Sequence, residues 1–116
     1  MLEVRALPFK FDGNIPFQWV PGNPIFPTFL NGLSFFAVGF ERYLIKGLKG
    51  VLPLIDDAAA KEDAKLFLKQ EAQYSLAHKC HVDAMVRLYP GLASTLEKTN
   101  QHFDDLYDRE NTATTT

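Results

Sequence analysis

The sequence predicts an all-α protein, a partial helical bundle of about three helices with an extended, proline-rich N-terminal arm. Long stretches at residues 28–52 and 58–88 contain no proline and carry apolar residues at helical spacing. Five of the seven prolines fall within residues 1–27, which prevents a long helix there. No alternating apolar and polar pattern typical of strands persists anywhere in the chain.

Residues 1–27 are predicted to form the extended arm. Turn-forming residues recur along it, as in the runs Asp12-Gly13-Asn14 and Pro21-Gly22-Asn23-Pro24. The side chains expected to anchor it are apolar and aromatic: Phe9, Phe11, Phe17 and Trp19.

The first helix is predicted to begin near Thr28, which can serve as its N-cap. The residues of this segment would make the helix apolar on nearly all of its faces, so we expect it to be central or well covered. Gly47 and Gly50 weaken its C-terminal end, and Pro53 is predicted to end or kink it.

Asp56 and Asp57 offer an N-cap for a second, long helix over residues 58–88, which Pro90-Gly91 ends. A third helix is predicted from Ser94 to about Tyr107. We therefore expect one helical domain over residues 1–116, a fragment of a larger bundle. In this division residues 1–27 are the arm, residues 28–110 hold the helices, and residues 111–116 form a disordered tail.

Composition narrows the function. The net charge of −2 lacks the basic surface that nucleic-acid binding requires, so no nucleic-acid partner is expected. A single cysteine, Cys80, excludes an internal disulfide and cysteine-rich zinc sites, and it fits a cytoplasmic location. The apolar run at residues 25–40 is interrupted and too short to span a bilayer, so a buried helix is expected instead.

Chemically useful side chains gather in the second predicted helix. Glu71, Tyr74, Ser75 and His78 would project from one helical face. A carboxylate with an imidazole suits zinc, iron or manganese. Seven residues span about 10.5 Å of helix, so Glu71 and His78 are near the limit for sharing one ion. Two neighbouring ions, each bound by one of them, would be a more comfortable arrangement.

Glu41 is the natural companion from the first helix. It follows the apolar run at residues 35–40, where a carboxylate is costly unless it is paired, protonated or bound to a metal. Arg42 points about 100° away on a helix and would not pair with it easily. A salt-bridged or interfacial carboxylate remains the alternative interpretation of Glu41.

Several segments together resemble the predicted metal-dependent hydrolase family over roughly residues 3–90. The matching segments are IPFQW at 15–19, GNP at 22–24, GFERY at 39–43, LPLID at 52–56, FLKQEAQ at 67–73, and His78. The resemblance implies a ferritin-like or related di-metal helical bundle. The family pattern Glu-x-x-His-x-x-x-His has Tyr74 at its first histidine position here.

The resemblance implies a metal-assisted hydrolase with a divalent transition metal, namely iron, zinc or manganese. Its ligands would be Glu41, Glu71 and His78, with Tyr74 and His81 as further candidates. A ferritin-like di-iron site needs a glutamate from two helices and a Glu-x-x-His pair from two others. This sequence supplies only part of that set, so we expect a homo-oligomer or a missing C-terminal half to complete it.

Three other interpretations remain open. Glu71 and His78 can belong to a polar helix face without metal. The chain can be a catalytically inactive helical interaction or oligomerisation module, because Tyr74 occupies a ligand position. It can also be a di-iron, oxygen-activating protein with the same ligands. Nothing in the sequence selects a substrate.

Overall fold

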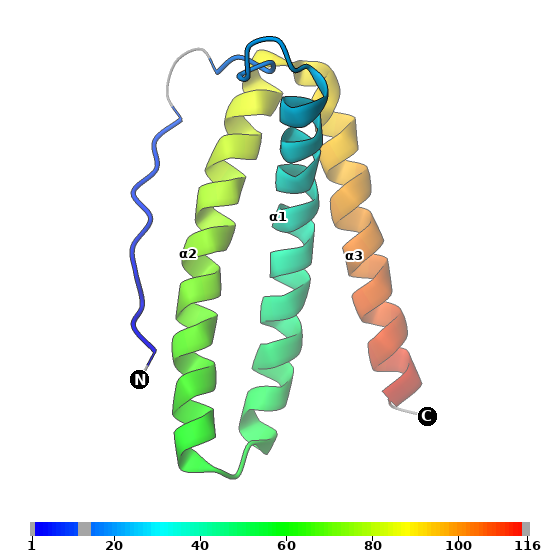
Figure 1. Cartoon of the computed structure of the whole chain (residues 1–116). Coiled ribbons are helices and arrows are strands. Elements are labelled where there is room, and N and C mark those ends of the chain that lie inside the picture. The colour runs from blue at the N-terminus through cyan, green and yellow to red at the C-terminus, as the bar shows by residue number, and fades with distance from the viewer. Residues whose placement is uncertain (1, 12–14, 115–116) are drawn as a thin grey trace.

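The computed structural model describes residues 2–11 and 15–114, and these residues contain helices and no strands. The prediction of an all-α fold is therefore confirmed (Figure 1). Two 3₁₀ turns connect the long helices. In chain order the elements are α1 (Ile25–Val51), η1 (Leu52–Leu54), α2 (Ala58–Leu88), η2 (Pro90–Leu92) and α3 (Ala93–Thr114).

Helix α1 begins at Ile25, three residues before the predicted start at Thr28. Pro27 lies in the first turn, where its missing N–H would have no helical partner in any case. The side chain of Asn23 accepts a hydrogen bond from the N–H of Phe26 at 3.2 Å and takes the capping role. The Thr28 hydroxyl instead donates to the carbonyl of Pro24 at 2.7 Å, so Thr28 is not the N-cap.

Helix α2 has the predicted bounds, and the Asp57 carboxylate caps it by accepting the Ala60 N–H at 2.7 Å. Helix α3 begins at Ala93 and extends to Thr114. Residues 111–114 are therefore helical rather than part of the predicted disordered tail, and residues 115–116 lie outside the described part. No glycine or proline follows Gly91, so nothing in this stretch interrupts the helix.

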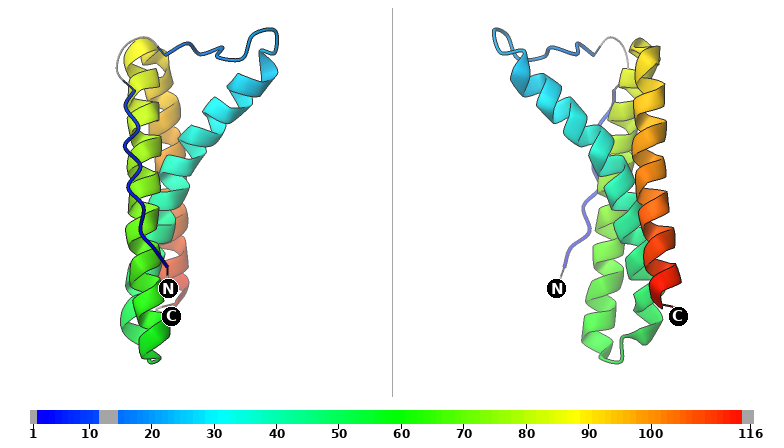
Figure 2. Two further views of the ribbon diagram at one scale, coloured as in Figure 1. Left: turned by 60° about the vertical axis from the view of Figure 1, so that its left-hand side comes forward. Right: turned by 90° about the vertical axis from the view of Figure 1, so that its right-hand side faces the viewer.

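Helix α1 is the central element and contacts both α2 and α3. Its C-terminal half packs along the other two helices, whereas its N-terminal half leans away from them, as both views of Figure 2 show. The buried core consists of Phe35 from α1 with Val82 and Met85 from α2. Leu92 of η2 and Leu96 of α3 cover this core. The buried residues of α1 lie between Pro27 and Glu41, so the core meets the middle of this helix, and no residue of α1 after Glu41 is buried.

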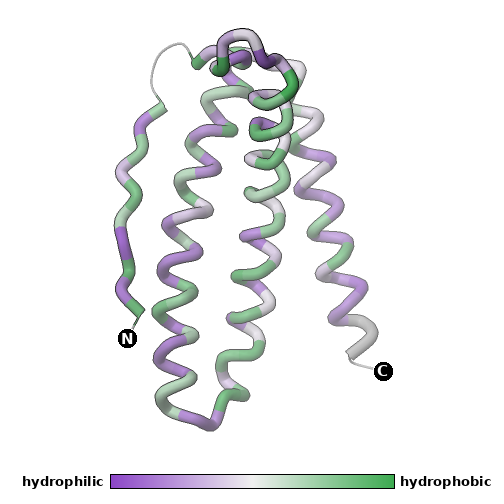
Figure 3. The backbone as a smooth tube through the Cα atoms, in the orientation of Figure 1, coloured by the Kyte–Doolittle hydropathy of each residue, from purple (hydrophilic) through white to green (hydrophobic). Residues whose placement is uncertain are grey.

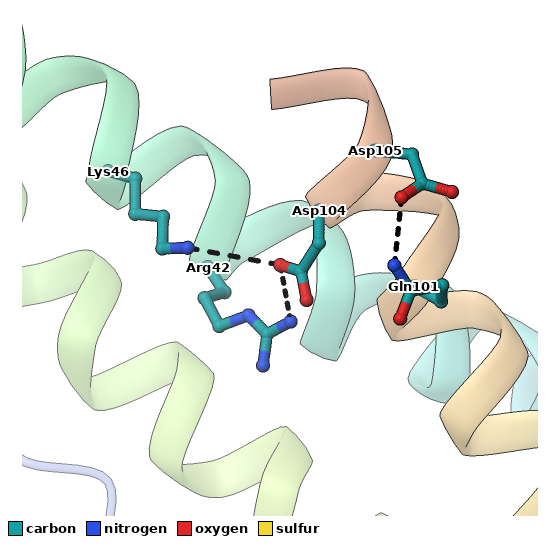
Figure 4. Close-up of polar contacts among 5 residues, drawn as sticks. All are labelled: Arg42, Lys46, Gln101, Asp104 and Asp105. Atoms are coloured by element: carbon teal, nitrogen blue, oxygen red, sulfur yellow. Dashed lines mark hydrogen bonds and ion pairs between the residues drawn. The ribbon is translucent and has the colours of Figure 1, made fainter. Parts of the chain in front are cut away.

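The contact between α1 and α3 rests on Gly39 and Phe103. The Phe103 ring packs directly on the backbone of Gly39. A Cβ atom at position 39 would lie only 2.5 Å from the Cδ2 atom of Phe103. Beside this contact, Arg42 donates to Asp104 at 2.7 Å, and Lys46 lies 3.9 Å from the same oxygen (Figure 4). Arg42 therefore has a partner on α3 and does not neutralise Glu41. These side chains are partly exposed, so the ion pairs add little stability.

The arm runs beside α2 from near its middle towards its C-terminal end (Figure 1). Gln70 fastens it by accepting the N–H of Arg5 at 2.6 Å and donating to the Arg5 carbonyl at 3.2 Å. Arg87 donates to the carbonyl of Phe11 at 3.1 Å. The arm thereby forms a wall along α2.

The predicted well-covered helix at α1 is only partly realised. Apolar residues run along α1, whereas α3 is mostly hydrophilic (Figure 3). Several large apolar side chains of α1, Phe29 among them, are more than two-fifths exposed. Phe29 lies in the half of α1 that leans outward (Figure 2), whereas Phe36 and Phe40 contact Phe103 of α3 on one side only. Among the described residues, no helix combines the length and apolar character that crossing a bilayer requires.

Candidate functional site

Glu41 is the most unusual charged residue of the fold. It lies on the face of α1 that meets α2, and it is 8% exposed. Its Oε2 atom is buried and has no hydrogen-bond partner. An unpaired polar atom in such a position is costly, and native structures contain few of them. A bound cation or another partner would therefore stabilise Glu41 in this position.

Helix α2 brings two of the predicted site residues towards Glu41. The Nε2 atom of His78 lies 3.6 Å from Glu41 Oε1. Burial, and to a smaller extent the negative charge of Glu71, raises the pKa of Glu41 from 4.5 to about 7. Glu41 and His78 are thus in contact across α1 and α2, and Glu71 lies near enough to influence the charge of Glu41.

The pair of Glu41 and His78 fits a shared metal ion. Two donor atoms bound tetrahedrally to one zinc ion are roughly 3.4 Å apart, close to the distance seen here. The free lone pairs of the buried Oε2 atom offer a further donor. In residues 2–11 and 15–114, however, no three His, Cys, Asp or Glu side chains are grouped closely enough to hold an ion. The structure therefore brings two of the three candidate residues, Glu41 and His78, into contact.

The remaining candidates of α2 divide between two faces. Tyr74, His78 and His81 line the same cavity, whereas Ser75 lines a second cavity of about 330 Å³ bordered by α1, α2 and α3. His81 is half-buried, and its Nδ1 atom lies 3.0 Å from the hydroxyl oxygen of Ser34. Burial, and to a smaller extent the nearby His78, lowers the pKa of His81 below 6.5. This hydrogen bond orients the His81 ring through Nδ1, as commonly happens for histidines that ligate a metal through the other ring nitrogen, so His81 stays a candidate ligand.

The larger cavity has a volume of about 570 Å³ and opens where α1 leans away from α2. The arm closes one side of it. Its apolar walls come from the arm, α1 and α2: Leu7, Phe9, Phe11, Ile15, Trp19, Leu30 and Ala77. Its polar groups are Asn31, Ser34, Tyr74, His78 and His81. This size and this mixture of many apolar walls with few polar groups are typical of small-molecule sites.

Two polar residues of α1 that shape this cavity were missed by the sequence analysis. Asn31 is 2% exposed, accepts the Trp19 indole N–H at 3.1 Å and donates to the Phe17 carbonyl at 2.9 Å. Ser34 is the partner of His81. Both interrupt an otherwise apolar stretch, and a buried polar residue in such a stretch needs partners. That interruption was the signal available in the sequence.

The fold and this site define a helical protein with a carboxylate and an imidazole facing one another beside an apolar cavity. The chain belongs to the family of predicted metal-dependent hydrolases, whose family model matches residues 3–115. The suspected family is thereby confirmed. No curated protein and no solved structure matches the chain.

Proposed function

We propose that this chain is a metal-dependent hydrolase that binds a divalent transition ion through Glu41 and His78, with Glu71 completing the protein ligands. Zinc, iron and manganese all accept this combination of carboxylate and imidazole. The observation that supports the proposal most strongly is the buried Glu41 carboxylate, whose Oε1 atom faces His78 and whose Oε2 atom has no hydrogen-bond partner. A cation there would offset both the burial of Glu41 and its repulsion from Glu71.

The chain's own residues would bind and orient the substrate beside this centre. A bound ion supplies Lewis acidity and lowers the pKa of water to about 7. His78 both contacts Glu41 and lines the cavity, so it joins the ion site to the space where a substrate can lie. Tyr74 presents a hydroxyl at the same edge, and Ser34 fixes the orientation of the His81 ring. The apolar walls would contact the apolar part of a substrate.

Calorimetric titration of the metal-free protein with Zn²⁺ tests the ligand assignment. We expect wild type to bind about one ion per site, and Glu71→Ala to weaken the affinity at least about tenfold, or about 1.4 kcal/mol. Glu97→Ala, an exposed glutamate of α3, is the matched control and should leave the affinity unchanged. Absence of zinc, iron and manganese binding in wild type, or equal affinities for both variants, would refute the proposal.

A second function, self-association, is favoured by one feature of α1. Five large apolar residues recur at alternating spacings of three and four and form what we call the α1 stripe: Phe26, Phe29, Leu33, Phe36 and Phe40. Each is between 41% and 61% exposed. This spacing is that of a seam between paired helices. We propose that a second copy of the chain covers the α1 stripe and supplies further ligands or walls to the site.

The exposed area agrees with such a pairing. The chain exposes 8061 Å², whereas a compact monomer of 13.1 kDa exposes roughly 6,400 Å². A standard interface removes about 800 Å² from each partner. The surplus surface is therefore more than large enough for one interface, although the extended arm contributes part of it.

Sedimentation velocity tests this association at micromolar concentration. We expect wild type to sediment as a dimer and Phe29→Glu to sediment as a monomer, because a charge in an apolar interface loses its hydration. Leu76→Glu is the matched control: Leu76 is 55% exposed on α2, outside the α1 stripe, and its substitution should leave the dimer intact. Monomeric wild type, or equal effects of the two substitutions, would contradict the pairing.

A further inference from the structure

The cavity between α1, α2 and the arm differs in charge from the centre beside it. Among the described side chains that line it, none is a lysine or an arginine. Near His78 the neighbouring charged groups are acidic, because Glu41 contacts this lining residue and lies near Glu71. On the arm side, in contrast, Arg87 is held by the carbonyl of the lining residue Phe11. An anionic ligand would find no permanent cation in the walls and would be repelled by the carboxylates. In the metal-free protein this disfavours phosphate esters and long-chain carboxylates as ligands.

The distribution of polar groups indicates how a ligand would lie. Apolar side chains from the arm, including Phe9, Phe11 and Ile15, form one wall. Tyr74 and His78 lie on the α2 side, which also carries the candidate centre. A ligand with an apolar body and one uncharged polar group would match both parts. Its body would contact the arm, and its polar group would accept hydrogen bonds near Tyr74 and His78.

We propose that the cavity binds a neutral carboxylic ester with an apolar acyl chain, and that such esters are the substrate class of the site. The claim that esters are substrates rests on the proposed hydrolase function. The claim that the cavity binds them does not. Hydrolysis would join the oxygen of water to the carbonyl carbon and break the acyl C–O bond. One proton of the water passes to the departing alcohol, so no oxidant, reductant or other co-reactant is required.

Binding can be followed without metal because Trp19, the one tryptophan of the chain, lines the cavity. We expect methyl octanoate to change the Trp19 fluorescence of the metal-free protein saturably. Octanoate and octyl phosphate, which share the chain but carry a charge, should bind at least about tenfold more weakly. Equal affinities for the ester and the two anions would overturn the assignment, as would no response to the ester.

Two substitutions that fill the cavity locate the binding site. Ala77→Phe on α2 and Leu30→Phe on α1 add bulk from opposite walls and should each weaken ester binding at least about tenfold. Ala72→Phe adds the same group at an exposed position of α2 outside the cavity and should have no effect. Two filling variants are used so that one that fails to fold does not decide the result. Undiminished binding in a folded filling variant would place the ligand elsewhere and overturn the proposal.

The ester-binding and metal-binding experiments test separate claims, so either claim can be refuted without the other. Ester binding without any metal affinity would refute the hydrolase function and leave the cavity's ligand class standing. Metal binding without ester binding would refute the cavity's ligand class and leave the hydrolase function standing. Where both succeed, the zinc-loaded protein should release octanoic acid from methyl octanoate and no phosphate from octyl phosphate. Release of phosphate in preference to octanoic acid would overturn the substrate class.

Discussion

Replacing Glu41 with glutamine should stabilise the metal-free protein by about 3 kcal/mol at pH 8 and leave it almost unchanged near pH 4.5. Burial and Glu71 raise the pKa of Glu41 from 4.5 to about 7 in the folded protein. The folded state therefore binds this proton more tightly than the unfolded state does. Wild-type stability contributed by this group is present below pH 4.5 and is lost as the pH rises through 7. At about 1.4 kcal/mol per pKa unit, the full loss approaches 3 kcal/mol.

Thermal unfolding followed by circular dichroism in the presence of a chelator measures this effect. A gain of about 3 kcal/mol corresponds to a rise in Tm of roughly 10 °C for a chain of this size. Glu97→Gln removes an exposed carboxylate from α3 and serves as the control without an effect. Glu71→Gln removes the smaller cause of the pKa rise and should stabilise less than Glu41→Gln. If the difference in stability between wild type and Glu41→Gln were the same at pH 4.5 and at pH 8, the ionised Glu41 carboxylate would not be destabilising.

Zinc should reverse the order of the two proteins. A ligand that binds only the folded state stabilises it in proportion to the logarithm of its concentration over Kd. Wild type, with the Glu41 carboxylate, should therefore gain more from saturating zinc than Glu41→Gln does. A residue that lowers stability alone and raises it with a cation is held for binding rather than for packing. Equal gains from zinc in both proteins would leave Glu41 without a role as a ligand.

The parts of the fold that local signals determine were predictable from the sequence. Helix α2 has its predicted bounds because Asp57 caps one end and Pro90 follows the other. The start of α1 was misplaced because a proline is equally compatible with an extended arm and with the first turn of a helix. Helix α3 passes the predicted end at Tyr107, because weak helix formers end a helix only where a breaker follows.

The candidate site was predictable only where one segment carried the signal. Glu41 could be singled out because a carboxylate in an apolar helix needs a partner. The cavity could not, because its walls come from the arm, α1 and α2, and the lean of α1 creates the space. The hydrogen bond between His81 and Ser34 joins residues 47 positions apart, which no local pattern encodes. That contact holds the His81 ring at the cavity wall through its Nδ1 atom.

The close approach of α3 to α1 leads to the second large effect. Gly39→Ala would place a methyl group 2.5 Å from Cδ2 of Phe103, so the ring or the helix must move. The Phe103 ring is 6% exposed and contacts Phe36, Phe40 and Tyr43, which leave it little room. Such overpacking costs about 1–3 kcal/mol, and the better helix propensity of alanine returns up to about 1 kcal/mol. We expect a net loss of about 1–2 kcal/mol.

Gly47→Ala is the matched control because it makes the same change eight residues along the same helix. A Cβ at Gly47 meets nothing within 4 Å, so only the gain in helix propensity of up to about 1 kcal/mol remains. The two substitutions should therefore shift Tm in opposite directions. Gly39 lies two residues before Glu41, so displacement of α1 at Gly39 should also weaken zinc binding, whereas Gly47→Ala should not. If both variants were stabilised alike, α3 would not be seated against Gly39, and the packing that positions Glu41 would have to differ from the arrangement described.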